Sequence, residues 1–165
     1  MKKFLPIVIV VALLLVAIPL LRQYRTVGLA AGQNAPAFTL QDLGGKAVNL
    51  ADYQGQVVMI NFWSAACPPC REEMPAMQKV YDELKDDGFV ILAINVNDVP
   101  AVVKKFIESN GYTFTILKDD GVVAKTYEVQ FIPKTLILDR DGVVRFVEVG
   151  QLSEAQIRSA VQAWL

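Results

Sequence analysis

The chain has 165 residues and a formal net charge of −1, and this length accommodates one domain of ordinary size. It contains no histidine, which removes the usual general base and the commonest protein ligand of zinc, copper and iron. The first 25 positions hold four basic residues and no acidic one, so the remainder has 12 basic against 17 acidic residues, a formal charge of −5. That balance argues against nucleic acid as a partner.

The first segment is an uncharged apolar run of 18 residues from Phe4 to Leu21. A helix of this length extends roughly 27 Å, close to the hydrocarbon thickness of a bilayer, so we predict a transmembrane anchor within residues 1–25. A cleaved signal peptide is the alternative, because Lys2 and Lys3 precede the run and Ala30-Ala31 offers a cleavage site. A core helix is disfavoured, since only a larger protein could cover it on all sides. Basic residues on both flanks leave its orientation undecided.

The next residues predict a linker and then the start of the folded domain. Residues 26–35 are rich in Ala and Gly and lack periodicity, which is typical of a linker, so the domain is expected at 36–165. Phe38–Leu40 and Ala47–Leu50 flank Gly44-Gly45. This pattern predicts a short β-hairpin at the start of the domain.

The centre of the domain alternates between strand and helix patterns. Val57–Trp63 is an almost continuous apolar run rich in β-formers, as expected for a strand buried on both faces. Apolar residues then recur at spacings of three and four from Met74 to Leu84, and Gly88 predicts the end of that helix. Phe89–Asn95 predicts a second strand and Val99–Ser109 a second helix. The alternation indicates a parallel β-α-β unit.

The last third of the chain predicts further strands and helices. The turn residues Asp139–Gly142 separate two apolar runs and indicate a hairpin. Ser153 and Gln156 stand three apart and predict a capping box for the final helix. The elements are a weak strand at Thr113–Leu117, a helix at Val122–Tyr127, strands at Thr135–Leu138 and Val143–Val149, and a helix after Ser153.

The chemistry of the chain centres on Cys67-Pro68-Pro69-Cys70, which directly follows a predicted strand and begins a predicted helix. Unpaired N–H groups and the macrodipole at a helix N-terminus favour a thiolate, and prolines cost little there. We therefore expect Cys67 to attack a disulfide and Cys70 to resolve the mixed disulfide. One alternative is half of a zinc site, which would need two further ligands. The other is a structural disulfide, whose loop is too short to stabilise much.

Three segments carry a resemblance to a known family. Residues 61–75, from Asn61 through the two cysteines to Pro75, resemble the active-site block of the TlpA/ResA group of membrane-anchored thioredoxin-like proteins. Residues 32–40 are similar to the opening segment of that group, and residues 132–142 to its cis-proline loop and hairpin. The resemblance covers about residues 32–165. It implies a thioredoxin-like α/β fold, with a central mixed sheet flanked by helices and an N-terminal hairpin extension.

The resemblance also implies roles for residues outside the cysteine pair. Pro133 is implied to be a cis-proline opposite the cysteines and to bind substrate together with Ile132 and Trp63. Glu73 follows Cys70 by one helical turn and is implied to act as an acid–base catalyst near the thiols. The plain alternatives are an ordinary proline at the start of a strand and a solvated helix charge.

Two residues depart from the patterns of related proteins. Ala66 stands where the family usually has Trp directly before the first cysteine, which should leave Cys67 less covered. Asn61 stands where thioredoxin has a buried Asp, and an amide cannot take a proton. This second departure leaves Glu73 as the acid–base candidate.

The sequence therefore predicts a thiol-disulfide oxidoreductase at the cell membrane, with a single span and no cofactor or metal, and the resemblance implies that its domain is extracytoplasmic. The resemblance implies a reductase that receives electrons from a membrane thiol donor and acts on exported proteins such as apocytochrome c, and we expect a monomer. A thiol oxidase or isomerase of the same fold is the alternative, because the direction depends on a potential that four residues do not define. A metal-delivery or peptide-binding module is disfavoured, since copper chaperones of this kind need a histidine.

Overall fold

The computed structural model describes residues 29–165, and the predicted anchor and residues 26–28 of the predicted linker lie outside the described residues. The strands are β1 (Thr39–Asp42), β2 (Ala47–Asn49), β3 (Val57–Trp63), β4 (Phe89–Val96), β5 (Thr115–Asp119), β6 (Lys134–Leu138) and β7 (Val144–Val149). The helices are α2 (Pro68–Leu84), α3 (Pro100–Asn110), α4 (Val122–Thr126) and α5 (Glu154–Gln162), with short 3-10 turns η1 (Leu50–Tyr53) and η2 (Lys85–Asp87).

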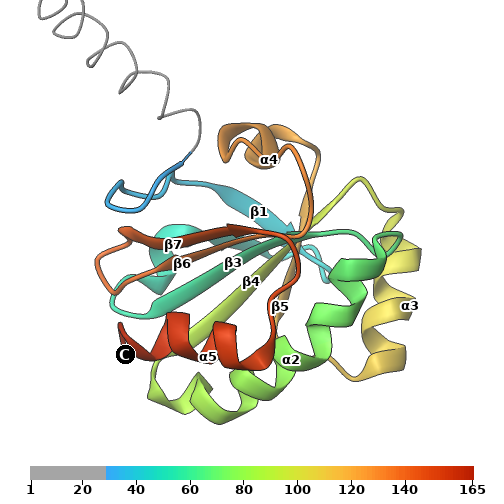
Figure 1. Ribbon diagram of the computed structural model, residues 1–165. Coiled ribbons are helices and arrows are strands. Elements are labelled where there is room, and N and C mark those ends of the chain that lie inside the picture. The colour runs from blue at the N-terminus through green and yellow to red at the C-terminus, as the bar shows by residue number, and fades with distance from the viewer. Residues whose placement is uncertain (1–28) are drawn as a thin grey trace, which may run out of the picture.

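The strands of the described region form one mixed sheet in the order β2-β1-β5-β4-β3-β6-β7. Figure 1 shows α2, α3 and α5 on one side of this sheet and α4 on the other. Strand β3 runs parallel to β4 and antiparallel to β6, and every one of its residues is buried. Because helices cover both faces of the sheet, the sequence of β3 is an almost continuous apolar run. The predicted parallel β-α-β unit is confirmed, and β4-α3-β5 repeats it.

The edges of the sheet are antiparallel. The predicted N-terminal hairpin is confirmed as β1 and β2, and β1 also pairs with β5, so the hairpin extends one edge of the sheet. Strands β6 and β7 form the predicted hairpin at the other edge. Strand β5 lies two residues further along the chain than predicted, because its pairing with β4 and β1 includes the polar residues Lys118 and Asp119.

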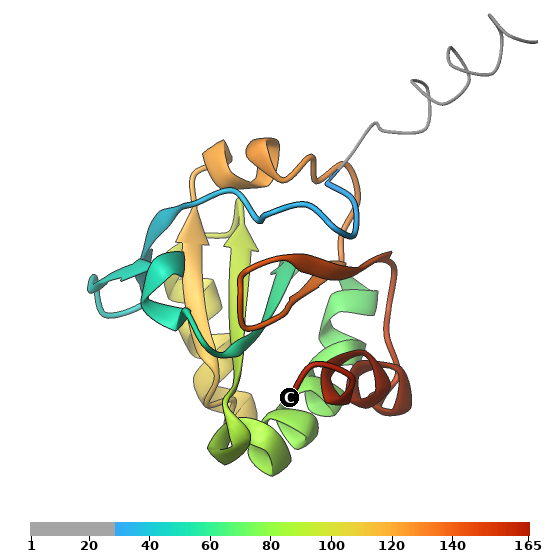
Figure 2. The ribbon, with the colours of Figure 1, turned by 90° about the vertical axis from the view of Figure 1, so that its left-hand side faces the viewer.

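The segment before β1 is attached to the hairpin of β6 and β7. The N–H of Gly32 donates to the carbonyl of Val144 at 2.7 Å, and the N–H of Ala35 donates to that of Gly142 at 3.0 Å. Figure 2 shows this blue segment crossing below α4 before it enters the sheet. The hydroxyl of Tyr127, at the end of α4, donates to the carbonyl of Pro36 in the same segment at 2.6 Å. Contacts with the domain therefore begin within the stretch expected to be a linker.

Two apolar clusters fill the space on either side of the sheet. One lies beneath α2, α3 and α5 and includes Trp63, Met74 and Val103, whereas the other lies beneath α4 and includes Phe62 and Tyr127. The predicted capping box is present at the start of α5, where Ser153 and Gln156 exchange hydrogen bonds. Among residues 29–165, no helix has the length and apolarity that a membrane crossing requires.

Candidate active site

The two cysteines lie where β3 gives way to α2. After Trp63 the chain makes a short turn, and Cys67 becomes the N-cap of α2 while Pro68 and Pro69 open the helix. The Sγ of Cys67 accepts the N–H of Cys70 at 3.3 Å, and the two residues form a disulfide with a Cα–Cα distance of 5.3 Å. Cys67 is partly exposed, whereas Cys70 is 2% exposed. This difference fits the predicted division into an attacking and a resolving sulfur.

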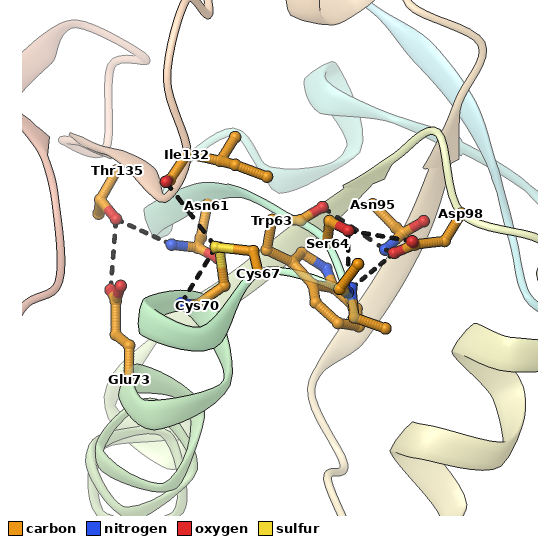
Figure 3. Close-up of a disulfide and its surroundings, with 12 residues drawn as sticks. Asn61, Trp63, Ser64, Cys67, Cys70, Glu73, Asn95, Asp98, Ile132 and Thr135 are labelled. Atoms are coloured by element: carbon orange, nitrogen blue, oxygen red, sulfur yellow. Dashed lines mark hydrogen bonds between the residues drawn. A yellow bond between two sulfur atoms is a disulfide. The ribbon is translucent and has the colours of Figure 1, made fainter.

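The turn before Cys67 is held by the carboxylate of Asp98. Its Oδ1 accepts the hydroxyl of Ser64 at 3.0 Å, and its Oδ2 accepts the N–H of Ala65 at 2.6 Å and the amide of Asn95 at 2.8 Å (Figure 3). Sequence reasoning missed Asp98 and Asn95. A usable signal existed, because Asn95 lies near the end of β4 and Asp98 lies shortly after that strand, and the carboxyl ends of neighbouring parallel strands meet at one edge of a sheet.

The loop before β6 lies against the attacking sulfur. The Ile132–Pro133 peptide bond is cis, which confirms the conformation implied by the resemblance. The carbonyl oxygen of Ile132 lies 3.8 Å from Sγ of Cys67, and Ile132 is partly exposed while Pro133 is buried. Phe131, directly before them, is 71% exposed, and no sequence pattern singled it out. Substrate binding by Ile132 and Pro133 stays a prediction.

Trp63 does not fit the substrate-contact role expected for it. Its side chain is fully buried and belongs to the apolar cluster that also contains Cys70. The indole packs against Phe106 with ring centroids 5.6 Å apart. A fully buried ring offers no surface to a partner, so Trp63 underlies the cysteine pair instead of flanking it.

Glu73 is fully buried one turn beyond Cys70, so the alternative of a solvated helix charge is wrong. Its Oε1 accepts the hydroxyl of Thr135 at 3.5 Å, and its Oε2 has no hydrogen-bond partner among the described residues. Burial raises the pKa of Glu73 to about 7, opposed by the backbone N–H of Leu152 and by the Thr135 hydroxyl. The carboxyl is therefore able to take up or release a proton near neutral pH.

Asn61 and Thr135 face each other across β3 and β6, and the amide of Asn61 donates to the hydroxyl of Thr135 at 2.9 Å. Figure 3 shows Thr135 joined by one dashed line to Asn61 and by another to Glu73, beside the cysteine turn. The groups at the site with acid–base or redox chemistry are the two sulfurs and the carboxyls of Glu73 and Asp98, and the Asp98 carboxylate is taken up by the hydrogen bonds that hold the turn. Within residues 29–165, no group of three or more acidic, cysteine or histidine side chains could hold a metal ion.

A known protein family matches most of the chain. This match agrees with the strand order, the cysteine turn and the cis-proline loop described above. A model of the AhpC/TSA family matches residues 31–147. The chain belongs to this family. It resembles the thiol-disulfide oxidoreductase ResA of Halalkalibacterium halodurans, with 35% identity over 133 residues that cover 80% of this chain and 76% of the relative. The ResA of Geobacillus kaustophilus is 38% identical over 135 residues, which cover 81% and 78% of the two chains.

Solved structures of thiol-disulfide oxidoreductases and related chains are similar to this one. A putative thiol:disulfide interchange protein DsbE from Chlorobium tepidum superposes with a TM-score of 0.74 at 32% identity, covering 81% of this chain and 99% of the other. StoA from Bacillus subtilis gives a TM-score of 0.67 at 27% identity, covering 76% and 96%. This AhpC/TSA family member is therefore a ResA-like thiol-disulfide oxidoreductase with a thioredoxin-like fold.

Proposed function

We propose that this oxidoreductase reduces disulfides of exported proteins, such as apocytochrome c, from a position anchored in the cell membrane. The observation that carries the proposal is the pair of unequal sulfurs at the N-terminus of α2, with Cys67 partly exposed, Cys70 buried, and the buried carboxyl of Glu73 one turn further on. The apolar run from Phe4 to Leu21 supports the anchor, and the resemblance to the TlpA/ResA group supports an extracytoplasmic domain.

In the proposed reaction, the Cys67 thiolate attacks one sulfur of the substrate disulfide. A bond forms between these two sulfurs, and the second substrate sulfur leaves as a thiolate that takes a proton from solvent. The Cys70 thiolate then attacks Sγ of Cys67, which releases the first substrate sulfur as a thiolate that is also protonated. The protein ends with the Cys67–Cys70 disulfide, and the substrate has gained two electrons and two protons. A membrane thiol donor returns two electrons to the pair.

Glu73 is the group proposed to take the proton of the Cys70 thiol before the second step. Its side chain lies on the same helix one turn away, and its pKa near 7 keeps part of the population ionised at neutral pH. A carboxylate also opposes formation of a thiolate close to it.

The direction of electron flow is tested by the reduction potential of the full chain. Equilibration with dithiol buffers, followed through the fluorescence of Trp63 beside Cys70, gives the potential directly. For a reductase we expect a value nearer the about −270 mV of thioredoxin than the about −120 mV of DsbA. A value close to that of DsbA would make the protein an oxidase. Release of free thiols from disulfide-bonded apocytochrome c is the matching substrate assay.

The role of Glu73 is tested by the rate of disulfide exchange as a function of pH. Glu73→Gln should slow exchange near neutral pH because the proton acceptor is gone, and its rate profile should lose the dependence on a group with a pKa near 7. Glu72→Gln, an exposed neighbour on the same helix, is the control and should behave as the wild type. Superimposable profiles for Glu73→Gln and the wild type would rule out this role.

A further inference from the structure

Three buried polar side chains interrupt the apolar layer between the sheet and α2. Asn61 of β3 is 1% exposed, and Thr135 of β6 and Glu73 of α2 are fully buried. Their neighbours on the same face of the two strands are Met59, Trp63 and Ile137 in the apolar cluster. Since buried polar groups cost free energy unless they are satisfied, an apolar pair at 61 and 135 would be the simpler core.

The hydrogen bonds among these side chains run in one direction. The amide of Asn61 donates to Oγ1 of Thr135 at 2.9 Å, and an amide nitrogen can only donate. The single hydroxyl proton of Thr135 is then directed to Oε1 of Glu73, 3.5 Å away. Because bonds to an ionised carboxylate are shorter and stronger, this long contact should tighten when Glu73 loses its proton.

The two oxygens of Glu73 are therefore not equivalent. Oε1 is occupied as an acceptor of the Thr135 hydroxyl, whereas Oε2 is buried and accepts no hydrogen bond of regular geometry among the described residues. The backbone N–H of Leu152 also lies close enough to lower the pKa of the carboxyl. A neutral carboxyl carries its proton on one oxygen, and the oxygen that already accepts a hydroxyl is the worse place for it.

We propose that Thr135, oriented by Asn61, is a positioning residue that holds Oε1 of Glu73 and leaves Oε2 as the oxygen that takes the proton of the resolving thiol. This inference rests on the proposed acid–base role of Glu73. With this role the site includes, besides α2, the cross-strand pair of Asn61 on β3 and Thr135 on β6. Thr135 lies two residues beyond the cis-proline.

Thr135 is the neighbouring side chain through which the pKa of Glu73 can be adjusted. The backbone N–H of Leu152 approaches from the segment before α5, and the Cys67–Cys70 pair lies on its own helix. The charged residue next to Thr135 across β6 and β7 is Glu148, which is exposed. Burial, Leu152 and Thr135 are the causes that set the pKa of Glu73.

The test is a carbon-13 NMR titration of the Glu73 carboxyl in the oxidised full chain, assigned by its absence in Glu73→Gln. Thr135→Val keeps the shape of the side chain and removes the hydroxyl, and it should raise the midpoint by about one pH unit. Thr135→Ser should restore the wild-type midpoint. Thr126→Val makes the same change on exposed α4 and should leave the midpoint unchanged.

A second variant, Asn61→Val, removes the amide that orients the Thr135 hydroxyl. It should also raise the titration midpoint of Glu73, and it provides the test if Thr135→Val does not fold. In disulfide exchange, the part of the pH–rate profile that requires ionised Glu73 should shift to higher pH by the same amount as the titration midpoint. An unchanged midpoint in the folded variants would overturn the proposal. Exchange profiles altered by Glu73→Gln but not by Thr135→Val would refute the positioning role alone, whereas profiles altered by neither would refute the role of Glu73 itself.

Discussion

The carboxylate of Asp98 accepts the backbone N–H of Ala65 at 2.6 Å, across the gap between the end of β4 and the turn that carries Cys67. The same carboxylate accepts the hydroxyl of Ser64, which in turn accepts the N–H of Ala66. One acidic side chain thus fixes the backbone that places the attacking sulfur. At Ala66 there is no large side chain to cover the turn, so its conformation depends on these polar contacts.

We predict that Asp98→Asn destabilises the protein. The amide has one acceptor oxygen where the carboxylate has two, so its NH2 group would face either the hydroxyl of Ser64 or the N–H donors of Ala65 and Asn95. The loss of free energy of unfolding should be about 1–3 kcal/mol, measured by urea denaturation of the oxidised protein. Asp86→Asn is the control, because Asp86 is exposed in η2, directly after α2. Equal denaturation midpoints for the two variants would show that the carboxylate does not hold the turn.

We predict that the stability of the oxidised protein falls as pH rises from 4.5 to 7. Burial raises the pKa of Glu73 from 4.5 to about 7, so in this window the folded state keeps a proton that the unfolded state has released. Below this window both states are protonated and the penalty disappears. The total loss should be about 3 kcal/mol. The chain has no histidine that would titrate in the same range.

The same prediction is checked with a variant. In Glu73→Gln the free energy of unfolding, measured by urea denaturation at several pH values, should be nearly flat over this window. Glu72→Gln, whose side chain is exposed, should keep the wild-type slope. A wild-type slope in Glu73→Gln would mean that another group causes the pH dependence.

We predict that Cys70→Ser accumulates mixed disulfides with its substrates. The partly exposed Cys67 can still attack, but the buried sulfur that completes the exchange is missing. Non-reducing gels of cells that express each variant should show higher-mass adducts for Cys70→Ser and none for Cys67→Ser. Equal capture by both variants would contradict the assignment of attacking and resolving sulfurs.

We predict that the mature protein keeps residues 4–21 as a tether, because the apolar length of that run suffices to span a bilayer. Fractionation should recover the full-length chain with membranes, and protease added to intact cells without a wall should reach the domain. A soluble mature chain that begins near Ala31 would instead establish a cleaved signal peptide.

The sequence alone determined those features that depend on neighbouring residues. The apolar run of β3 and the turn residues before β7 marked their elements, because burial and turn geometry leave local patterns. The cysteine pair was identified because a C-x-x-C motif between a buried strand and a helix is itself a local pattern. The capping box of α5 was visible for the same reason.

The tertiary structure decided which distant residues meet. Thr135 lies 74 positions from Asn61 and 62 from Glu73, and they come together only because β6 pairs beside β3 while α2 packs over both. Asp98 reaches Ala65 because β4 is the other neighbour of β3. The burial of Glu73 was equally undetermined by sequence, since a polar helix residue is covered only by elements whose placement depends on the order of the whole sheet.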